Sequence, residues 1–276
     1  MTGDQKDTMK ALQSFAVTTS HRPGPGQVEA AIQLALELGV PFAKRQDRSL
    51  EVLTLKLGVE GVVVVAANKI SCVVGEKEFF FHPGLARLRI MEQKNGKTDQ
   101  MIKAMSIGKG QSVLDCTLGL GTDAIVTSFV AGAGGRVTGL ESSPVIASLV
   151  RRGLATYPEP EEDIALAMRR ITVVNASHKE YLASLPPCSF DVIYFDPMFR
   201  RAIHKSSAMR ALRPLARGGS PGLETVNLAL RVARRRVVIK ERSGSEEFKR
   251  LGCLEVSGGK HAPVAYGILE KGMVSG

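Results

Sequence analysis

Three acidic residues lie where strands are predicted to end, and their carboxylates could position an organic ligand. Asp115, Glu141 and Asp196 each follow an apolar run of the sequence. A carboxylate can accept hydrogen bonds from the two hydroxyls of a ribose, attract a cation, or accept the hydrogens of an amine. The third acid opens "DPMF" (residues 196–199), where it is followed by a proline, a methionine and an aromatic ring. This stretch could hold a flat, amine-bearing ligand, although Asp-Pro is also typical of a turn that ends a strand.

A glycine-rich stretch follows the first of these acids. "LDCTLGLGTDA" (residues 114–124) places Gly119 and Gly121 between a predicted strand and a predicted helix. Glycines allow the backbone to turn tightly, and the start of a helix offers free N–H groups to a ligand. Glu141 follows Gly121 by twenty residues, which is also the nucleotide-binding pattern of NAD enzymes. Asp115 favours S-adenosylmethionine (SAM), because an anion there would repel a pyrophosphate but suits a sulfonium and an amine. The alternative is that the glycines merely tighten the turn.

The DPMF stretch has groups that could hold and orient the amine of a flat ligand such as a base. The lone pair of such an amine is delocalised into the ring, so positioning is the main catalytic lever. Asp196 and the carbonyl of Pro197 could accept the two amine hydrogens and stabilise positive charge on the nitrogen. Phe199 could stack on an extruded base, which is worth on the order of 1–3 kcal/mol. These three residues are therefore the catalytic candidates.

A basic run begins directly after the catalytic candidates. Residues 199–236 hold ten Lys or Arg residues and one acid, Glu224, in a chain whose net charge is +10. Such a run is often a solvated face, but its position favours a polyanionic substrate such as nucleic acid. The residues expected to grip phosphates are Arg200, Arg201, Lys205, Arg210 and Arg213.

Composition excludes several other classes of protein. The 276 residues are 44% hydrophobic, yet no apolar run is long enough to span a membrane, and the N-terminus does not resemble a signal peptide. Four cysteines and five histidines show no metal-binding spacing. We therefore expect a cytoplasmic protein with reduced cysteines, no metal and no membrane partner.

The order of the expected elements predicts two domains. Residues 1–95 read as a small N-terminal α/β domain, with the polar stretch 92–100 as a linker and Thr98 as the cap of a following helix. Residues 96–276 alternate strands with amphipathic helices and end in two strands. This alternation is typical of an α/β fold with a parallel sheet covered on both faces, whose ligands bind beyond the carboxyl ends of the strands.

From about residue 98 onward the sequence resembles the class I SAM-dependent methyltransferases. "VLDCTLGLGTDA", "VTGLES", "ITVVNASHKEYL" and "FDVIYFDPMF" are similar to four successive motifs of that family. "NASH", "HKSSAMRALR" and "RRVVIKE" resemble more narrowly the bacterial small-subunit ribosomal RNA guanine-N2 methyltransferases of the J type and their uncharacterised relatives. The resemblance implies a Rossmann-like, seven-stranded methyltransferase sheet.

The resemblance also implies roles for individual residues. Thr122 and Asp123 would contact the amino-acid part of SAM, and Ser177 and His178 the adenine, although many class members carry Asp where this chain has Ser177. Met198 replaces the second proline of the general motif but agrees with the J type. The full set of expected cofactor-binding residues is Asp115, Thr117, Gly119, Gly121, Thr122, Asp123, Glu141, Ser142, Ser177 and His178.

The expected function is methylation of an exocyclic base amine in RNA, with guanine N2 of small-subunit ribosomal RNA as the target. The expected partner is ribosomal RNA, naked or in a ribosomal particle. The same DPMF chemistry also serves adenine in DNA or a glutamine amide in protein. A catalytically silent RNA-binding protein and an NAD-dependent oxidoreductase are the alternatives from other classes.

Overall fold

The chain forms two β-sheets that belong to separate compact units. The computed structural model describes residues 14–197, 220–258 and 262–272. In the described residues, one unit holds 14–81 and 143–149, and the other holds 82–142, 150–197, 220–258 and 262–272. The expected division at residue 95 stays a prediction. No helix in the described ranges has the length and apolarity that crossing a bilayer requires.

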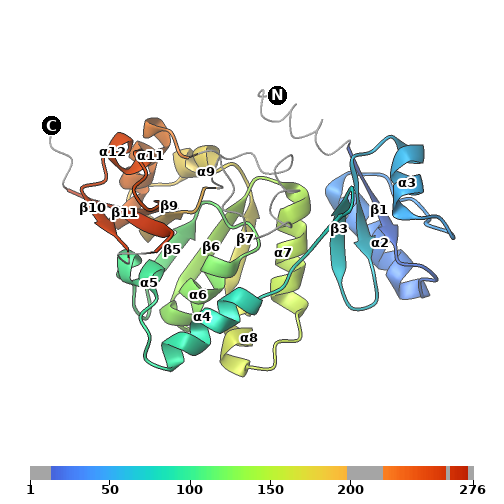
Figure 1. Ribbon diagram of the computed structural model, residues 1–276, viewed down its shortest axis with the longest axis horizontal. Helices are drawn as coiled ribbons and strands as arrows, with labels where there is room; N and C mark the ends of the chain where they lie inside the picture. Colours follow the sequence, from blue (N-terminus) through green and yellow to red (C-terminus); the bar gives the residue numbers. More distant parts are fainter. Residues whose placement is uncertain (1–13, 198–219, 259–261, 273–276) are drawn as a thin grey trace. The chain divides into compact units, whose positions relative to one another are not determined.

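The first unit is built on a four-stranded sheet. Its strands are β1 (Phe15–Thr19), β2 (Gly61–Val65), β3 (Ile70–Val74) and β4 (Lys77–Phe80), in the order β1-β2-β3-β4. Helices α2 (Pro25–Leu38) and α3 (Leu50–Leu57) accompany the sheet (Figure 1). Ser49 caps α3 by accepting a hydrogen bond from the N–H of Val52, and Gly58 ends it with φ of 65°. Both were expected from the sequence.

The second unit is built on a seven-stranded sheet whose order is β10-β11-β9-β8-β5-β6-β7. The strands β5 to β9 pair in parallel, and β11 and then β10 add antiparallel strands at one edge. Their bounds are β5 (Ser112–Asp115), β6 (Arg136–Glu141), β7 (Ile171–Asn175), β8 (Phe190–Phe195), β9 (Ala233–Arg242), β10 (Glu255–Ser257) and β11 (Val264–Glu270). The strand count and the α/β class agree with the Rossmann-like expectation.

Helices cover both faces of the seven-stranded sheet. Their bounds are α4 (Gly84–Lys94), α5 (Gln100–Met105), α6 (Thr122–Ala131), α8 (Glu162–Arg169), α9 (His178–Ser184), α11 (Leu223–Val232) and α12 (Glu247–Arg250). Helix α7 (Pro144–Thr156) is divided between the two units after Leu149. Helix α6 packs against α4 and α8, whereas α9 and α11 pack together as a separate group (Figure 1). Apolar side chains of α9 and α11, such as Leu182 and Val226, form one core with residues of β8 and β9.

The direction of winding reverses between β5 and β8. Strand β5 pairs with β6 on one side and with β8 on the other, and the two crossovers run to opposite edges. Such a switch point leaves a crevice beyond the carboxyl ends of the strands, where ligands bind in α/β sheets. Asp115 ends β5 and Asp196 directly follows β8, so the switch point brings the two acids together.

Two sequence expectations about the segment before β5 are wrong. Residues 92–94, expected as linker, are the last residues of α4, which the sequence pattern did not predict. Asp99, not Thr98, caps α5, because its carboxylate accepts hydrogen bonds from the N–H groups of Met101 and Ile102. Helix α8 was also not predicted.

Candidate active site

Four parallel strands deliver the side chains of the candidate site to one edge of the sheet. Asp115 ends β5, Glu141 ends β6, Asp196 follows β8, and Lys240 lies near the end of β9. Asp115 pairs with Tyr194 across β5 and β8. All four residues belong to the second unit, so their arrangement is set within one compact body. The shared edge was expected for the three acids.

The glycine-rich loop leaves β5 and enters α6 through two left-handed residues. Gly119 has φ of +50° and Gly121 has φ of +79°, a backbone conformation that favours glycine. Among the residues that the structure describes, the nearest neighbour of a Cβ at Gly119 would be 3.9 Å away, so these residues leave the backbone there open to close approach. Gly121 is the N-cap of α6, and within the described ranges no side chain caps this helix. The N–H groups of its first turn can therefore receive an anionic group of a ligand.

Thr117 connects the glycine-rich loop to the DPMF stretch. Its backbone N–H donates to Asp115 Oδ1 at 3.0 Å. Its hydroxyl oxygen accepts a hydrogen bond of 2.6 Å from the backbone N–H of Asp196. The residue therefore fixes the start of the glycine-rich loop and the start of DPMF relative to each other.

Asp115 is buried, with a relative exposure of 2%. Burial raises the pKa of this carboxyl to about 8; the nearby acids Asp123 and Asp196 add to the rise, while the hydrogen bonds from Thr117 oppose it. At neutral pH the side chain is therefore mostly protonated. A cationic ligand beside it would favour the carboxylate.

Asp123, in the first turn of α6, is the centre of a charged cluster. Its carboxylate accepts hydrogen bonds from Arg89 on α4, from the hydroxyl of Tyr194 at 2.7 Å and from Lys240 Nζ at 3.2 Å. Arg89 also binds both carboxylate oxygens of Asp99, at 2.8 and 3.0 Å. Burial alone would raise the pKa of Asp123, but Lys240 and Arg89 outweigh it and hold the pKa well below its usual range. This carboxylate is ionised and fully engaged.

Lys240 joins this cluster to Asp196. Its Nζ donates to Asp196 Oδ2 at 2.7 Å, so the ammonium group lies between the carboxylates of Asp123 and Asp196. Burial raises the pKa of Asp196 to about 6; Lys240 pulls it down and Asp123 pushes it up. Lys240 is bound to one carboxylate oxygen of Asp196, Oδ2, and the Asp196 side chain is 30% exposed. Asp196 can therefore receive a donor from a ligand.

The edge beyond β6 and β7 carries the remaining cofactor candidates. Glu141 is buried, and its backbone carbonyl accepts a hydrogen bond of 2.7 Å from the side chain of Asn175. Ser177 is the N-cap of α9, which His178 begins. The His178 ring packs edge-on against Phe195, with centroids 5.7 Å apart, and burial lowers the pKa of its imidazole. His178 is therefore a neutral ring at neutral pH.

The structure places only part of the predicted site. The described residues include Asp196 and Pro197 and all of the expected cofactor set. The predictions for Phe199, for Met198 and for the basic residues Arg200, Arg201, Lys205, Arg210 and Arg213 lie outside the described residues. No cluster of possible metal ligands occurs in the described ranges.

Sequence reasoning underestimated three members of the charged cluster. Tyr194 was interpreted as core, and it is buried, but its hydroxyl also binds Asp123. Lys240 was considered either as part of the site or as an ion-pair partner; its ion pairs are with Asp123 and Asp196 themselves. Arg89 was missed because its helix was not predicted. The signal for Lys240 was its place at the carboxyl end of a parallel strand.

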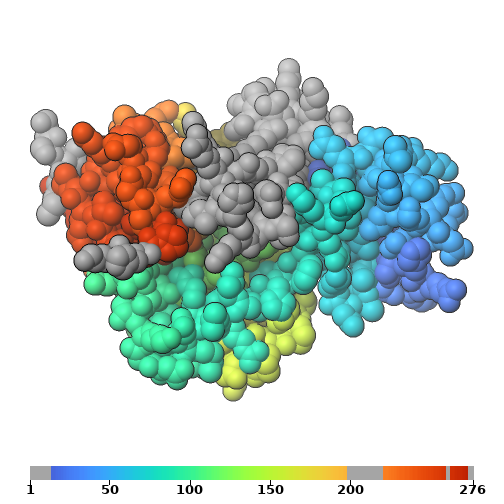
Figure 2. Space-filling view, viewed as in Figure 1, coloured from blue at the N-terminus to red at the C-terminus, as the bar shows by residue number. Residues whose placement is uncertain are grey.

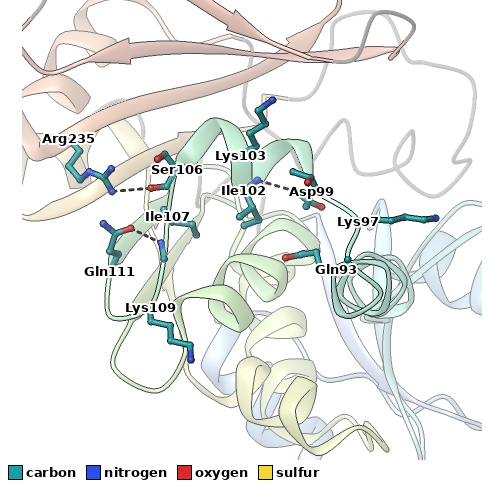
Figure 3. Close-up of a pocket in the computed structure, with 13 residues that line it drawn as sticks. Gln93, Lys97, Asp99, Ile102, Lys103, Ser106, Ile107, Lys109, Gln111 and Arg235 are labelled. Atoms are coloured by element: carbon teal, nitrogen blue, oxygen red, sulfur yellow. Dashed lines mark hydrogen bonds between the residues drawn. The ribbon is translucent and has the colours of Figure 1, made fainter.

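A pocket of about 810 Å³ lies near the amino ends of the parallel strands, where α5 leads into β5. It is therefore away from the carboxyl ends that carry the candidate site. Lys97, Lys103 and Lys109 line it, but their side chains point in different directions (Figure 3). Arg235 is bound to the carbonyl of Ser106 at 3.0 Å. These cations do not converge on a common point, so the pocket lacks the geometry of an anion site. In Figure 2, its surroundings (green) adjoin the C-terminal strands (red), consistent with the packing of α5 against β9 and β11.

Comparisons with known proteins agree with this geometry. The family model described as "Putative SAM-dependent methyltransferase" matches residues 69–254. Uncharacterized protein YpiP of Bacillus subtilis is 36% identical over 255 residues, which cover 92% of this chain and 98% of that protein. Ribosomal RNA small subunit methyltransferase J of Chromobacterium violaceum is 33% identical over 226 residues, which cover 78% of this chain and 83% of that protein.

A solved structure shares the fold. The SAM-dependent methyltransferase NGO1261 from Neisseria gonorrhoeae superposes with a TM-score of 0.61, covering 94% of this chain and 97% of that one. At 18% sequence identity, this likeness shows a common architecture.

Proposed function

Because this chain belongs to the SAM-dependent methyltransferase family, we propose that it methylates an exocyclic amine of a base in RNA, with guanine N2 of small-subunit ribosomal RNA as the target. The cofactor is SAM. The relative from Chromobacterium violaceum, a ribosomal RNA methyltransferase by name, supports the RNA substrate. The net charge of +10 supports a polyanionic partner. A ribosomal RNA substrate would place the protein in the cytoplasm.

The groups at the sheet edge fit SAM. The open backbone at Gly119 and the uncapped first turn of α6 suit a ligand carboxylate. We assign the ribose hydroxyls to Glu141, with Ser142 beside it, and the adenine to Ser177 and the neutral ring of His178. Asp115 suits a cationic group, because an anion in that position would repel the pyrophosphate of NAD.

Within the expected cofactor set, Thr122 and Asp123 need different assignments. Thr122 begins α6 and is partly exposed, so its N–H and hydroxyl can reach the amino-acid part of SAM. Asp123 is engaged by Arg89, Tyr194 and Lys240. We assign it the role of an anchor for the charged cluster, with any contact to SAM made through its backbone N–H.

Methyl transfer at this site depends on aiming the amine. When bound, SAM supplies a methyl group on a sulfonium, whose carbon–sulfur bond breaks as the carbon–nitrogen bond forms, leaving a neutral thioether. Asp196 and the carbonyl of Pro197 accept the two amine hydrogens and direct the nitrogen lone pair. Asp196 also stabilises the positive charge that develops on the nitrogen, and it can receive the proton that the nitrogen then loses.

Substrate capture is assigned to the residues that follow Pro197. Phe199 stacks on the extruded base. The basic residues Arg200, Arg201, Lys205, Arg210 and Arg213 contact flanking phosphates, which position the RNA without reading its sequence. Sequence selection must then come from RNA shape and from the pocket that receives the base.

The hydrogen bond between Asp196 N–H and Thr117 Oγ1 is the observation that best supports this proposal, because it sets the amine-binding acid beside the cofactor loop. The test is to incubate the protein with methyl-labelled SAM and, separately, small-subunit ribosomal RNA, assembled small subunits, duplex DNA and a total protein extract. Label in the RNA or in the assembled subunits supports the proposal. Label confined to DNA or protein would overturn it.

A further inference from the structure

Lys240 occupies a position that the proposed chemistry does not by itself require. It lies near the end of β9, next to β8, and its ammonium group binds the carboxylates of both Asp123 and Asp196. Its side chain is 19% exposed. At this burial the ammonium group loses most of its hydration, and the two carboxylates replace it. Exposed lysines, by contrast, rarely keep one fixed geometry in their ion pairs.

The rest of the charged cluster fixes Lys240 in this place. Asp123 is held by Arg89 and by the Tyr194 hydroxyl at 2.7 Å. Arg89 is held in turn by Asp99, whose carboxylate also caps α5. The chain of contacts therefore runs from a helix cap to the edge of the sheet, and each charged member has a partner of opposite sign.

We propose that Lys240 is a positioning residue for methyl transfer: it binds one oxygen of Asp196, keeps that carboxylate ionised, and leaves the other oxygen for the amine of the substrate. The proposal rests on the role assigned to Asp196 in the proposed function. It adds a residue that does not touch the substrate but determines the direction and the charge of the one that does.

The electrostatics of the site show why an ammonium group is needed there. Among the described residues, the titratable groups that face Asp196 are Asp115 on β5, Asp123 on α6, Tyr194 on β8 and Lys240 on β9. Asp123 is ionised and would repel a second carboxylate. Burial already raises the pKa of Asp196, and Lys240 limits that rise to about 6. Without Lys240, Asp196 would hold a proton at neutral pH and would accept amine hydrogens poorly.

The first test measures Asp196 without RNA. The ¹³C resonance of its carboxyl group, assigned by its loss in Asp196→Asn, is titrated by NMR in the wild type and in Lys240→Met. We expect a pKa of about 6 in the wild type and a value at least about one unit higher in the variant. An unchanged titration would overturn the proposal. Because this readout does not involve methyl transfer, it separates failure of the inference from failure of the proposed function.

The second test uses the pH–rate profile. In Lys240→Met we expect kcat at pH 7 to fall about 10²-fold, the acid limb to move to higher pH, and SAM affinity to stay near that of the wild type. Lys240→Arg keeps the positive charge, so the acid limb of its pH–rate profile should remain in place. Its kcat should still fall, because the guanidinium group would orient the carboxylate of Asp196 differently. Lys103→Met, an exposed lysine on α5, is the control.

Three outcomes of this second test would contradict the proposal. One is wild-type kcat in Lys240→Met. Another is an equal loss of SAM binding and kcat in that variant, which would indicate a merely structural lysine. If Lys240→Met does not fold, Lys240→Arg decides: a displaced acid limb in this charge-preserving variant would overturn the proposal.

Discussion

Thr117 Oγ1 lies 2.6 Å from the backbone nitrogen of Asp196 and accepts its hydrogen bond, so one hydroxyl links the glycine-rich loop to the start of DPMF. The two residues are 79 positions apart in the sequence. Under the proposed function, this link would hold the methyl donor and the acceptor amine at a fixed separation. It also provides a conservative way to disturb the site.

Replacing Thr117 with valine should slow methyl transfer. Valine has the shape of threonine but leaves the N–H of Asp196 without its partner, at a cost of about 1–3 kcal/mol. We expect a lower kcat and a lower melting temperature in Thr117→Val, measured by single-turnover methylation and by thermal unfolding. Thr117→Ser retains the hydroxyl and should restore most of kcat. Wild-type kcat in Thr117→Val would show that the link does not matter.

Glu141→Ala should weaken SAM binding by about 1.5–3 kcal/mol, the worth of hydrogen bonds to a charged group. The reason is its assigned contact with the ribose hydroxyls at the end of β6. Isothermal titration calorimetry of the folded variant measures the change directly. Glu162→Ala, at an exposed position of α8, is the matched control and should bind SAM normally. If both variants bind alike, the ribose is held elsewhere.

SAM binding should release a proton near neutral pH. Asp115 has a pKa of about 8 in the free protein, so it holds a proton at pH 7, and the cationic groups of SAM favour its carboxylate. The affinity for SAM should therefore rise by up to tenfold per pH unit and level off above about pH 8. Calorimetry in buffers of different ionisation enthalpy counts the released protons. Asp115→Asn should show no such release; a release equal to that of the wild type would exclude Asp115.

The raised pKa of Asp115 also determines how the free energy of unfolding changes with pH. An unfolded aspartate loses its proton near 3.9, whereas folded Asp115 keeps it up to about 8. Between these values the folded state binds more protons, so the contribution of Asp115 to the free energy of unfolding is largest at low pH and declines as pH rises to about 8. Denaturant unfolding of the SAM-free protein should show this slope, and Asp115→Asn should reduce it.

Reversing Arg200, Arg201 and Lys205 to glutamate should abolish RNA binding and leave SAM binding intact. Phosphate contacts release counterions, so wild-type affinity should fall linearly with the logarithm of salt concentration. The control reverses three exposed lysines, Lys56, Lys103 and Lys109, and changes net charge by the same amount. Equal loss in both variants would mean that overall charge, not the basic run, binds RNA.

The sheet and the acids at its edge were predictable because hydrophobic periodicity reports local structure. Asp115, Glu141 and Asp196 each follow an apolar run, and parallel strands place such ends on one edge. The same reasoning put Lys240 there. The ion-pair partners of Lys240 were not predictable, because Asp123 and Asp196 lie 117 and 44 residues away in the sequence.

Helix α4 was not predictable because its apolar residues do not mark its buried face. Leu85 and Leu88 are 68% and 56% exposed, whereas Arg89 turns into the charged cluster. A cation on the inner face is stabilised by Asp99 and Asp123, which sequence periodicity does not reveal. Asp99 similarly displaced Thr98 as the cap of α5; both residue types cap helices well, but Asp99 also binds Arg89.

The most direct test of the account identifies the methylated nucleoside. RNA methylated in vitro by the wild type, Asp196→Asn and Asp196→Ala is digested and analysed by liquid chromatography and mass spectrometry, with SAM affinity measured in parallel. The account predicts guanosine methylated on its exocyclic nitrogen, a rate at least about 10³-fold lower in Asp196→Ala, partial activity in Asp196→Asn, and similar SAM affinity in all three. A methyl group on a ribose oxygen or a ring carbon, or full activity in Asp196→Ala, would contradict it.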